Sequence, residues 1–238
     1  MTDKGTLYLI PSPLSDGPLE DILPKKVLDV IASVDCYVVE EERTVRRFLS
    51  AAGRRGQVES LDLHVLNEHS TPAEVEALAS LFAEGRSVGL VSEAGLPAVA
   101  DPGAALVALC HRIGVKVVPL VGPSSLMMAL MSSGMCGQSF AFRGYLPAKT
   151  PERRRALQEL ERTSARLGGQ SEIFIETPYR NDAMLSDILE CCAPQTRLCI
   201  AVNITAPDEE IRTKTVREWK KAVPAIGKRP CVFILSAL

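Results

Sequence analysis

Acidic side chains and small residues follow two short apolar runs of this sequence. The run Val88–Val91 leads into Glu93, Gly95 and Asp101, and the run Cys36–Val39 leads into residues 40–43, three glutamates and an arginine. A carboxylate can act as a general base, and a guanidinium can stabilise a developing negative charge. Small residues let a ligand lie against the backbone. The pattern indicates a ligand site, with ordinary connecting loops and a solvated turn as the alternatives.

Both apolar runs are short and continuously hydrophobic, which is typical of strands buried on both faces of a parallel sheet. Loops that leave the carboxyl ends of such strands are where open α/β sheets bind ligands. Small-residue or proline-rich turns follow five of the predicted strands: Pro11–Asp16, Glu93–Pro97, Gly122–Ser125, Glu176–Pro178 and Asn203–Ala206. These loops suit a compact ligand held largely by backbone groups.

The order of strands and helices predicts an α/β protein of two α/β domains in series, 1–121 and 122–238. With 238 residues, 46% hydrophobic and 24% charged, the chain is long enough for two cores. A strand is expected at 59–63. Helices are expected at 21–33 with Pro24 in the first turn, at 71–84 behind a capping box of Thr71 and Glu74, at 101–113 and at 215–222.

Composition and missing motifs exclude several classes of function. The formal net charge of −2 gives no global attraction to nucleic acid, so any such binding must use a local patch. Neither G-x-x-x-x-G-K-[ST] nor G-x-G-x-x-G after a strand occurs, which disfavours P-loop NTPases and ordinary dinucleotide-dependent dehydrogenases. The N-terminus lacks a signal-like apolar region and no apolar run is long enough for a membrane span, so we expect a cytoplasmic protein.

The cysteines and histidines do not have the spacing of a metal site. The seven cysteines include no C-x-x-C pair and have mostly apolar neighbours, which is typical of buried reduced thiols. None of the three histidines has a zinc-like spacing to a cysteine or to another histidine. The sequence therefore predicts no metal.

Six segments together resemble a known family. LYLIPSPLSD, VDCYVVEEER, GLVSEAGLPAVADPG, VVPLVGPSSLMMAL, FRGYLPAK and ETPYR, in this order, are similar to motifs of the tetrapyrrole-methylase superfamily of S-adenosylmethionine-dependent methyltransferases. The branch that they resemble most methylates the 2′-oxygen of a cytidine ribose in small-subunit ribosomal RNA. The resemblance spans residues 5 to about 206.

This resemblance implies two α/β domains with the cofactor in the cleft between them, and a homodimer. It implies S-adenosylmethionine as cofactor, with S-adenosylhomocysteine as product, and contacts to it from Leu14, Ala94, Gly95, Leu96, Val99, Ser124, Ser125, Glu176 and Ile204. The reaction is an in-line displacement at an activated methyl group, so the enzyme mainly aligns the reactants. A poorly acidic ribose hydroxyl also needs a base or a cation. Candidates for the base are Glu93, Glu41 and Asp101, and candidates for the cation are Arg43, Lys149 and Arg180.

The segments also depart from the pattern of the RNA-modifying branch. The pattern S-D-A-G-T-P corresponds here to Ser92-Glu93-Ala94-Gly95-Leu96-Pro97. In the first half, P-I-G-N corresponds to P-L-S-D at 13–16, A-E-D-T-R to V-E-E-E-R at 39–43, and H-E-H-N-E to H-V-L-N-E at 64–68. In the second half, A-R-E-L-T-K corresponds to A-V-N-I-T-A at 201–206. Small positions persist more than charged ones, which predicts that cofactor binding is retained. Three functions stay open: an RNA methyltransferase acting on ribosomal RNA or the small subunit, a methyltransferase of a small molecule or other acceptor, and a cofactor-binding protein without turnover.

A basic stretch in the second half is the candidate contact for RNA phosphates: Lys149, Arg153, Arg154, Arg155, Arg162 and Arg166. Phosphate contacts of this kind position an RNA without reading its bases. A solvated helix face is the alternative interpretation.

Overall fold

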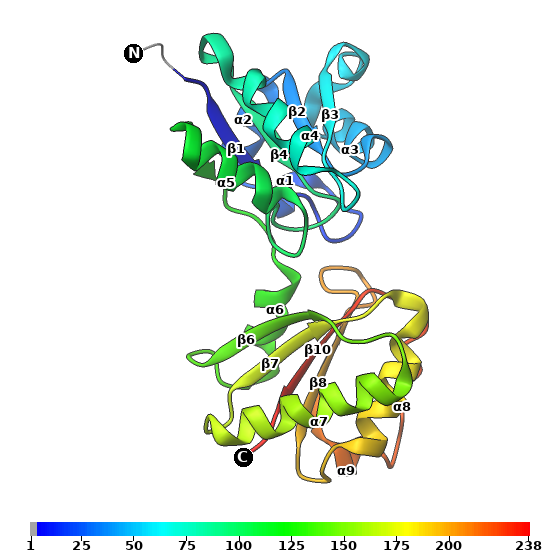
Figure 1. Ribbon diagram of the computed structural model, residues 1–238. Coiled ribbons are helices and arrows are strands. Elements are labelled where there is room, and N and C mark those ends of the chain that lie inside the picture. The colour runs from blue at the N-terminus through cyan, green and yellow to red at the C-terminus, as the bar shows by residue number, and fades with distance from the viewer. Residues whose placement is uncertain (1–3) are drawn as a thin grey trace. The chain divides into compact units, whose positions relative to one another are not determined.

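The computed structural model describes residues 4–238, with the side chain of Glu84 left aside. The chain divides into two compact units, Met1–Ser124 (unit 1) and Ser125–Leu238 (unit 2). Each unit has its own five-stranded sheet and its own helices (Figure 1). No helix among residues 4–238 has the length and apolar character needed to cross a membrane.

Unit 1 is built on an all-parallel sheet with the strand order β3-β2-β4-β1-β5. Its strands are β1 (Thr6–Ile10), β2 (Cys36–Val39), β3 (Asp62–Val65), β4 (Val88–Val91) and β5 (Lys116–Pro119). Its helices are α1 (Leu19–Ile22), α2 (Lys25–Ser33), α3 (Glu42–Leu49), α4 (Pro72–Ala77) and α5 (Gly103–Ile113), with short helical turns η1 (Ser50–Arg54), η2 (Val58–Ser60) and η3 (Leu78–Gly85).

Both faces of this sheet are covered. One core joins α2 and α3 to the sheet through residues such as Val27 and Val45, and the other joins η3 and α5 through Phe82 and Leu106. After β1 the chain continues to α2, on the face covered by the first of these cores. After β4 it continues to α5, on the opposite face. Because β1 and β4 are neighbours, the topological switch point of the sheet lies between their carboxyl ends, where open α/β sheets bind ligands.

Two predicted helices of unit 1 are interrupted, and each interruption has a local cause. The helix expected at 21–33 breaks into α1 and α2 because Leu23 precedes Pro24, and this position disfavours helical dihedral angles. Leu23 is extended, with φ −110° and ψ 129°. The helix expected at 71–84 keeps its Thr71/Glu74 capping box, as predicted, but continues beyond Ala77 as the 3₁₀ turn η3. The strand expected at 59–63 is β3, which begins at Asp62.

Unit 2 has a mixed sheet with the order β6-β7-β10-β8-β9. Its strands are β6 (Phe140–Tyr145), β7 (Ser171–Ile175), β8 (Arg197–Val202), β9 (Glu210–Thr215) and β10 (Cys231–Ser236). Its helices are α6 (Ser125–Ser133), α7 (Thr150–Arg166), α8 (Asn181–Cys191) and α9 (Val216–Trp219), with the turn η4 (Pro178–Arg180). Side chains of α7, α8 and α9 share one core with the sheet, and include Leu157, Ile188 and Trp219.

The edge strand β9 was not predicted; it lies directly before the region 215–222, where the sequence predicted a helix. Its sequence, EIRTKT, is mostly polar and pairs with β8 along one edge only. A strand of this kind lacks the apolar signal of a central strand, and polar side chains protect its free edge from other chains. The helix that follows, α9, begins at Val216 and ends at Trp219, three residues before the predicted end.

Candidate functional site

A backbone bridge joins two loops at the switch point of unit 1. The N–H of Ser12 donates to the carbonyl of Gly95 at 2.9 Å, and the N–H of Gly95 donates to the carbonyl of Ser12 at 3.1 Å. The Ser12 hydroxyl also donates to the carbonyl of Ser92 at 2.8 Å. The loops after β1 and β4 are therefore held together at the place where this sheet topology favours a ligand.

Gly95 has a conformation and surroundings that suit no larger residue. Its φ is +76°, in the left-handed region that favours glycine. A Cβ placed there would lie 3.3 Å from Leu14 Cδ2 and 3.6 Å from the carbonyl oxygen of Pro123. Leu14 and Gly95, both predicted as cofactor contacts, thus meet beside the loop that follows β5. Ala94 and Leu96 flank Gly95 in the same loop.

The rest of this loop carries two alanines in the left-handed region. Ala98 and Ala100 each have φ 64°, which is costly for a residue with a Cβ. The Asp101 carboxylate holds the turn, because it accepts the N–H of Ala98 at 2.9 Å and that of Gly103 at 2.7 Å. Burial raises the pKa of Asp101 above its ordinary value. Val99, another predicted cofactor contact, projects with 46% of its surface exposed.

Glu40, which the sequence analysis did not single out, lies at the carboxyl end of β2 facing this loop. Burial raises the pKa of the Glu40 carboxyl, the charges of Glu93 and Asp101 raise it further, and a hydrogen bond from the backbone N–H of Glu93 acts in the opposite direction. A partly buried carboxylate with a raised pKa at a strand end is typical of a general base. The sequence feature that could have identified Glu40 as a candidate base is its position as the first residue after the strand β2.

The other predicted acid–base residues of this region have different surroundings. The Glu41 carboxylate caps α3 by accepting the N–H of Arg43 at 2.8 Å and that of Thr44 at 2.6 Å. A hydrogen bond from the Thr44 side chain, together with these two backbone hydrogen bonds, lowers the pKa of Glu41, which makes Glu41 a weaker base. The side chain of Glu93 is exposed, and Arg43 is exposed in the first turn of α3.

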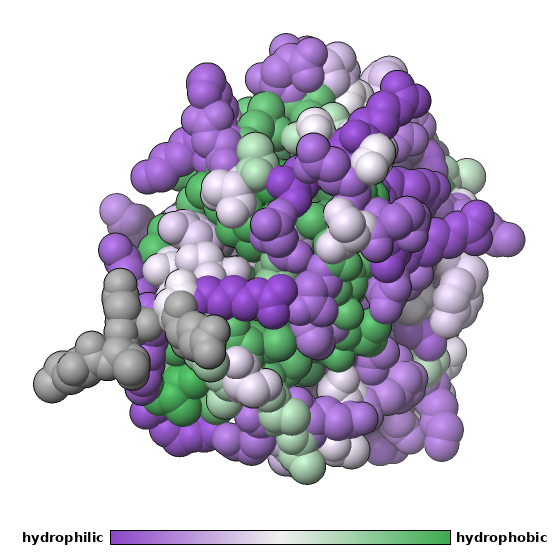
Figure 2. All heavy atoms as spheres, turned by 90° about the horizontal axis from the view of Figure 1, so that it is seen from above, coloured by the Kyte–Doolittle hydropathy of each residue, from purple (hydrophilic) through white to green (hydrophobic). Residues whose placement is uncertain are grey.

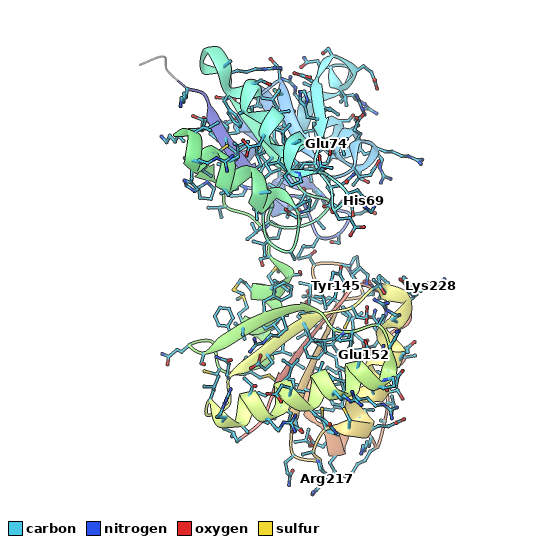
Figure 3. The ribbon with its side chains drawn as sticks, viewed as in Figure 1. His69, Glu74, Tyr145, Glu152, Arg217 and Lys228 are labelled. Carbon is cyan, nitrogen blue, oxygen red and sulfur yellow. The ribbon has the colours of Figure 1, made fainter. Side chains whose placement is uncertain are left out.

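In unit 2, the strands β6, β7 and β8 end at one edge of the sheet. Glu176 follows β7 there, and Tyr145 is the last residue of β6, with 59% of its surface exposed. Figure 3 shows Tyr145 and Lys228 at this edge of unit 2, with Arg217 at the opposite end. After β8, Asn203 and Thr205 have φ 49° and 74°, while the predicted cofactor contact Ile204 between them is buried.

Glu176 is a fully buried carboxylate with one oxygen in use. Its Oε1 accepts the N–H of Thr177 at 2.6 Å and two N–H groups of Arg180, at 2.9 Å from Nε and 2.6 Å from Nη2. Its Oε2 is buried and has no hydrogen-bond partner within residues 4–238. Such an oxygen is an acceptor suited to a ligand donor, because leaving it unpaired costs free energy. Arg180, predicted as a catalytic cation, orients this carboxylate.

The remaining predicted residues lie beside the unit boundary and before α7. Ser124 and Ser125 are half-buried where unit 1 ends and α6 begins. Lys149 is exposed immediately before α7. Two features of the structure fit S-adenosylmethionine. One is the small-residue Gly95 loop at the switch point of the unit 1 sheet. The other is the unpaired Oε2 of Glu176, which can accept a hydrogen bond from a hydroxyl, amino or ammonium group of the cofactor.

The structure corrects the prediction that Arg153 and Arg154 contact RNA. Arg153 is buried, and its guanidinium donates to Asp187 Oδ2 at 2.7 Å and to the carbonyl of Ala148 at 2.8 Å. Arg154 donates to the other oxygen of Asp187 at 2.7 Å. These arginines join α7 to α8. The exposed face of α7 retains Arg155, Arg162 and Arg166 but also carries Glu152 and Glu159, so it is not strongly basic.

We expect Arg153→Ala to lower the free energy of unfolding by about 3–5 kcal/mol, because it leaves the buried charge of Asp187 with fewer partners. The measurement is denaturant unfolding followed by the fluorescence of Trp219, the one tryptophan of the chain, which lies buried in unit 2. Arg155→Ala, two positions away on the exposed face, should change stability by less than about 0.5 kcal/mol. Equal effects of the two substitutions would contradict the assigned role of Arg153.

Comparisons with known proteins bear on the identity of this site. A family model described as tetrapyrrole (corrin/porphyrin) methylases matches residues 6–220. A curated relative named ribosomal RNA small subunit methyltransferase I, from Vibrio cholerae, is 35% identical over 92% of this chain and 74% of the relative. A relative of the same name from Escherichia coli O157:H7 is 33% identical over 98% of this chain and 78% of the relative.

Solved structures show the same fold. The crystal structure of the methyltransferase CobJ aligns with a TM-score of 0.64 at 20% identity, over 97% of this chain and 93% of that chain. Uroporphyrin-III C-methyltransferase from Thermus thermophilus, in complex with S-adenosylhomocysteine, aligns with a TM-score of 0.56 at 18% identity, over 97% of each chain. These similarities confirm the predicted architecture of two α/β units.

Proposed function

The chain belongs to the tetrapyrrole (corrin/porphyrin) methylase family, and we propose that it transfers a methyl group from S-adenosylmethionine to ribosomal RNA. The observation that carries this proposal is the 33–35% identity, over more than nine-tenths of the chain, to relatives named ribosomal RNA small subunit methyltransferase I. The proposed acceptor is a ribose 2′-hydroxyl, as the resemblance of the sequence motifs to the RNA-modifying branch implies.

We propose that each unit contains contacts to the cofactor, as the resemblance of the sequence motifs implies. In unit 1, the Ser12–Gly95 bridge holds the loops after β1 and β4 together. We propose that the cofactor contacts residues 94–96 beside this bridge. In unit 2, the Oε2 of Glu176 is the acceptor for a donor of the cofactor. S-adenosylmethionine, when bound, supplies a methyl group on a positively charged sulfur. Arg180 orients the Glu176 carboxylate by donating two hydrogen bonds to its Oε1.

Glu40 is the base that the structure supports best for a hydroxyl acceptor. A ribose hydroxyl is a weak nucleophile until its proton is removed, and a positioned carboxylate of raised pKa removes it more readily than an ordinary one. Asp101 holds the turn from Ala98 to Gly103, so we assign it a positioning role. Arg43 and Lys149 are exposed cations that can contact RNA phosphates.

A methyl-transfer assay tests the function directly. Small ribosomal subunits lacking their modifications are incubated with the purified protein and labelled S-adenosylmethionine, and the labelled nucleotide is then mapped by nuclease digestion and mass spectrometry. We expect label on the ribose of a single nucleotide. Label on a base would contradict the proposed acceptor atom. Cofactor binding without RNA labelling would favour a small-molecule acceptor or a protein without turnover.

We further propose that the protein acts as a homodimer, as the family resemblance implies, and that it acts in the cytoplasm, as the sequence features of its N-terminus predict. Support for a dimer comes from α6 and β6, which expose Met127, Met131 and Phe140 with 42%, 81% and 41% of their surfaces accessible. Apolar side chains that gather on a surface often mark an interface. Light scattering of the purified protein measures the oligomeric state, and a monomer at working concentrations would contradict this proposal.

A further inference from the structure

Three side chains of metal-binding type gather at the end of the unit 1 sheet opposite the cofactor loops. Cys36 and Asp62 begin the neighbouring strands β2 and β3 and are paired in register, and His64 lies two residues along β3. Because side chains alternate between the faces of a strand, all three project from one face. One ligand atom from each lies within 4.8 Å of the other two.

The imidazole of His64 faces the carboxylate of Asp62. Its buried Nε2 lies 3.0 Å from Asp62 Oδ1 and makes no other polar contact within residues 4–238. The other oxygen of Asp62 lies 2.7 Å from a guanidinium nitrogen of Arg86, whose side chain is 42% exposed. Arg86 can therefore turn into solvent if another cation takes its place at Asp62.

We propose that Cys36, Asp62 and His64 bind a divalent transition-metal ion of the zinc class. A thiolate, an imidazole and a carboxylate are ligands that zinc accepts together, whereas Mg²⁺ and Ca²⁺ prefer oxygen ligands alone. Three protein ligands leave the fourth position of a tetrahedral site for water. The ion would join the edge strand β3 to β2.

Ionisation of Cys36 accompanies binding of the ion. Burial raises the pKa of the Cys36 thiol to about 11, so the thiol is neutral before the ion arrives. A metal ion binds the thiolate, and its binding therefore releases one proton from Cys36.

Hydrophilic side chains are interspersed with hydrophobic ones on the face of the molecule seen from above in Figure 2, the side on which β1 begins in Figure 1.

Metal titration of the full chain tests the site. After treatment with a chelator and dialysis, the protein is titrated with zinc chloride in a calorimeter and, separately, with cobalt chloride in a spectrophotometer. We expect one ion per chain, a higher Tm with zinc, and the absorption band of a thiolate bound to cobalt. Loss of a group that only hydrogen-bonds to a metal ligand weakens metal binding by roughly 10–100-fold. His64→Gln removes a ligand itself, so it should weaken zinc binding by more than this.

Matched variants separate this site from adventitious binding. Cys36→Ser should abolish the cobalt–thiolate band, whereas Cys110→Ser, at a buried cysteine elsewhere in unit 1, should keep it. His69→Gln, at an exposed histidine, should keep the affinity for zinc. If Cys36→Ser does not fold, His64→Gln decides. Absence of the band from the wild type, or undiminished zinc affinity in His64→Gln, would overturn the proposal. Neither result depends on methyl transfer, so the proposed function is tested separately.

Discussion

Replacing Glu40 with glutamine should lower kcat for methyl transfer to RNA by about 10²–10⁴-fold, the usual contribution of a positioned general base. Glutamine has nearly the same shape and can keep the contact with the loop after β4, but it cannot take a proton. The affinity for S-adenosylmethionine, measured by calorimetry, should change little. A fall in cofactor affinity that accounts for the whole loss of activity would show instead that Glu40 binds the cofactor.

The control for this variant is Glu42→Gln, the same substitution two residues along the chain. Glu42 lies in the first turn of α3, and its carboxylate pairs with Arg46 at 3.3 Å, so it stands outside the proposed machinery. Its activity should stay within about twofold of the wild type, because surface pairs of this kind contribute little. Comparable losses in both variants would contradict the role of Glu40.

The pH dependence of the wild type gives a second measurement of the same base. Protonation of Glu40 removes the base, so kcat should fall as the pH falls through its pKa. Because burial and the charges of Glu93 and Asp101 raise that pKa, the fall should begin at a higher pH than for an ordinary glutamate. The residual activity of Glu40→Gln should lack this acidic limb.

Replacing Gly95 with alanine should weaken binding of S-adenosylmethionine by at least about tenfold, equivalent to about 1.4 kcal/mol, and valine should abolish it. A Cβ at this position would occupy the space beside Leu14 and Pro123 and would force an L-residue into φ +76°. We expect both substitutions to move the backbone of the Gly95 loop away from the ligand. Calorimetry on the folded variant gives the affinity directly.

Gly56→Ala is the matched control, because Gly56 also has a positive φ, +81°, but has no neighbouring atom within 4 Å of its Cβ position. It should carry a similar cost in stability, about 1–2 kcal/mol for a left-handed residue, without any loss of cofactor affinity. Unchanged affinity in Gly95→Ala would refute the placement of the cofactor at the Ser12–Gly95 bridge.

Much of the fold followed from local patterns that the sequence displays. The short apolar runs 36–39 and 88–91 predicted buried parallel strands, and the structure confirms both. The Thr71/Glu74 capping box is formed as predicted, since it needs only residues three apart. The polar edge strand β9 was missed because its sequence resembles a surface segment, and only its pairing with β8 makes it a strand.

By itself, the sequence determined where tight loops follow the strands, because small residues and prolines constrain the backbone locally, and it predicted that these loops carry the site. The tertiary structure decided which side chains are available in those loops. The carboxylate of Glu41 is engaged by the start of α3, that of Glu40 faces the Glu93 loop, and Arg153 is buried against Asp187 rather than exposed to RNA. Likewise, the strand register pairs Cys36 with Asp62 and so brings Cys36 close to His64, 28 positions along the chain. Burial, charge and proximity between distant residues are properties of the packed chain, and no spacing along the sequence encodes them one residue at a time.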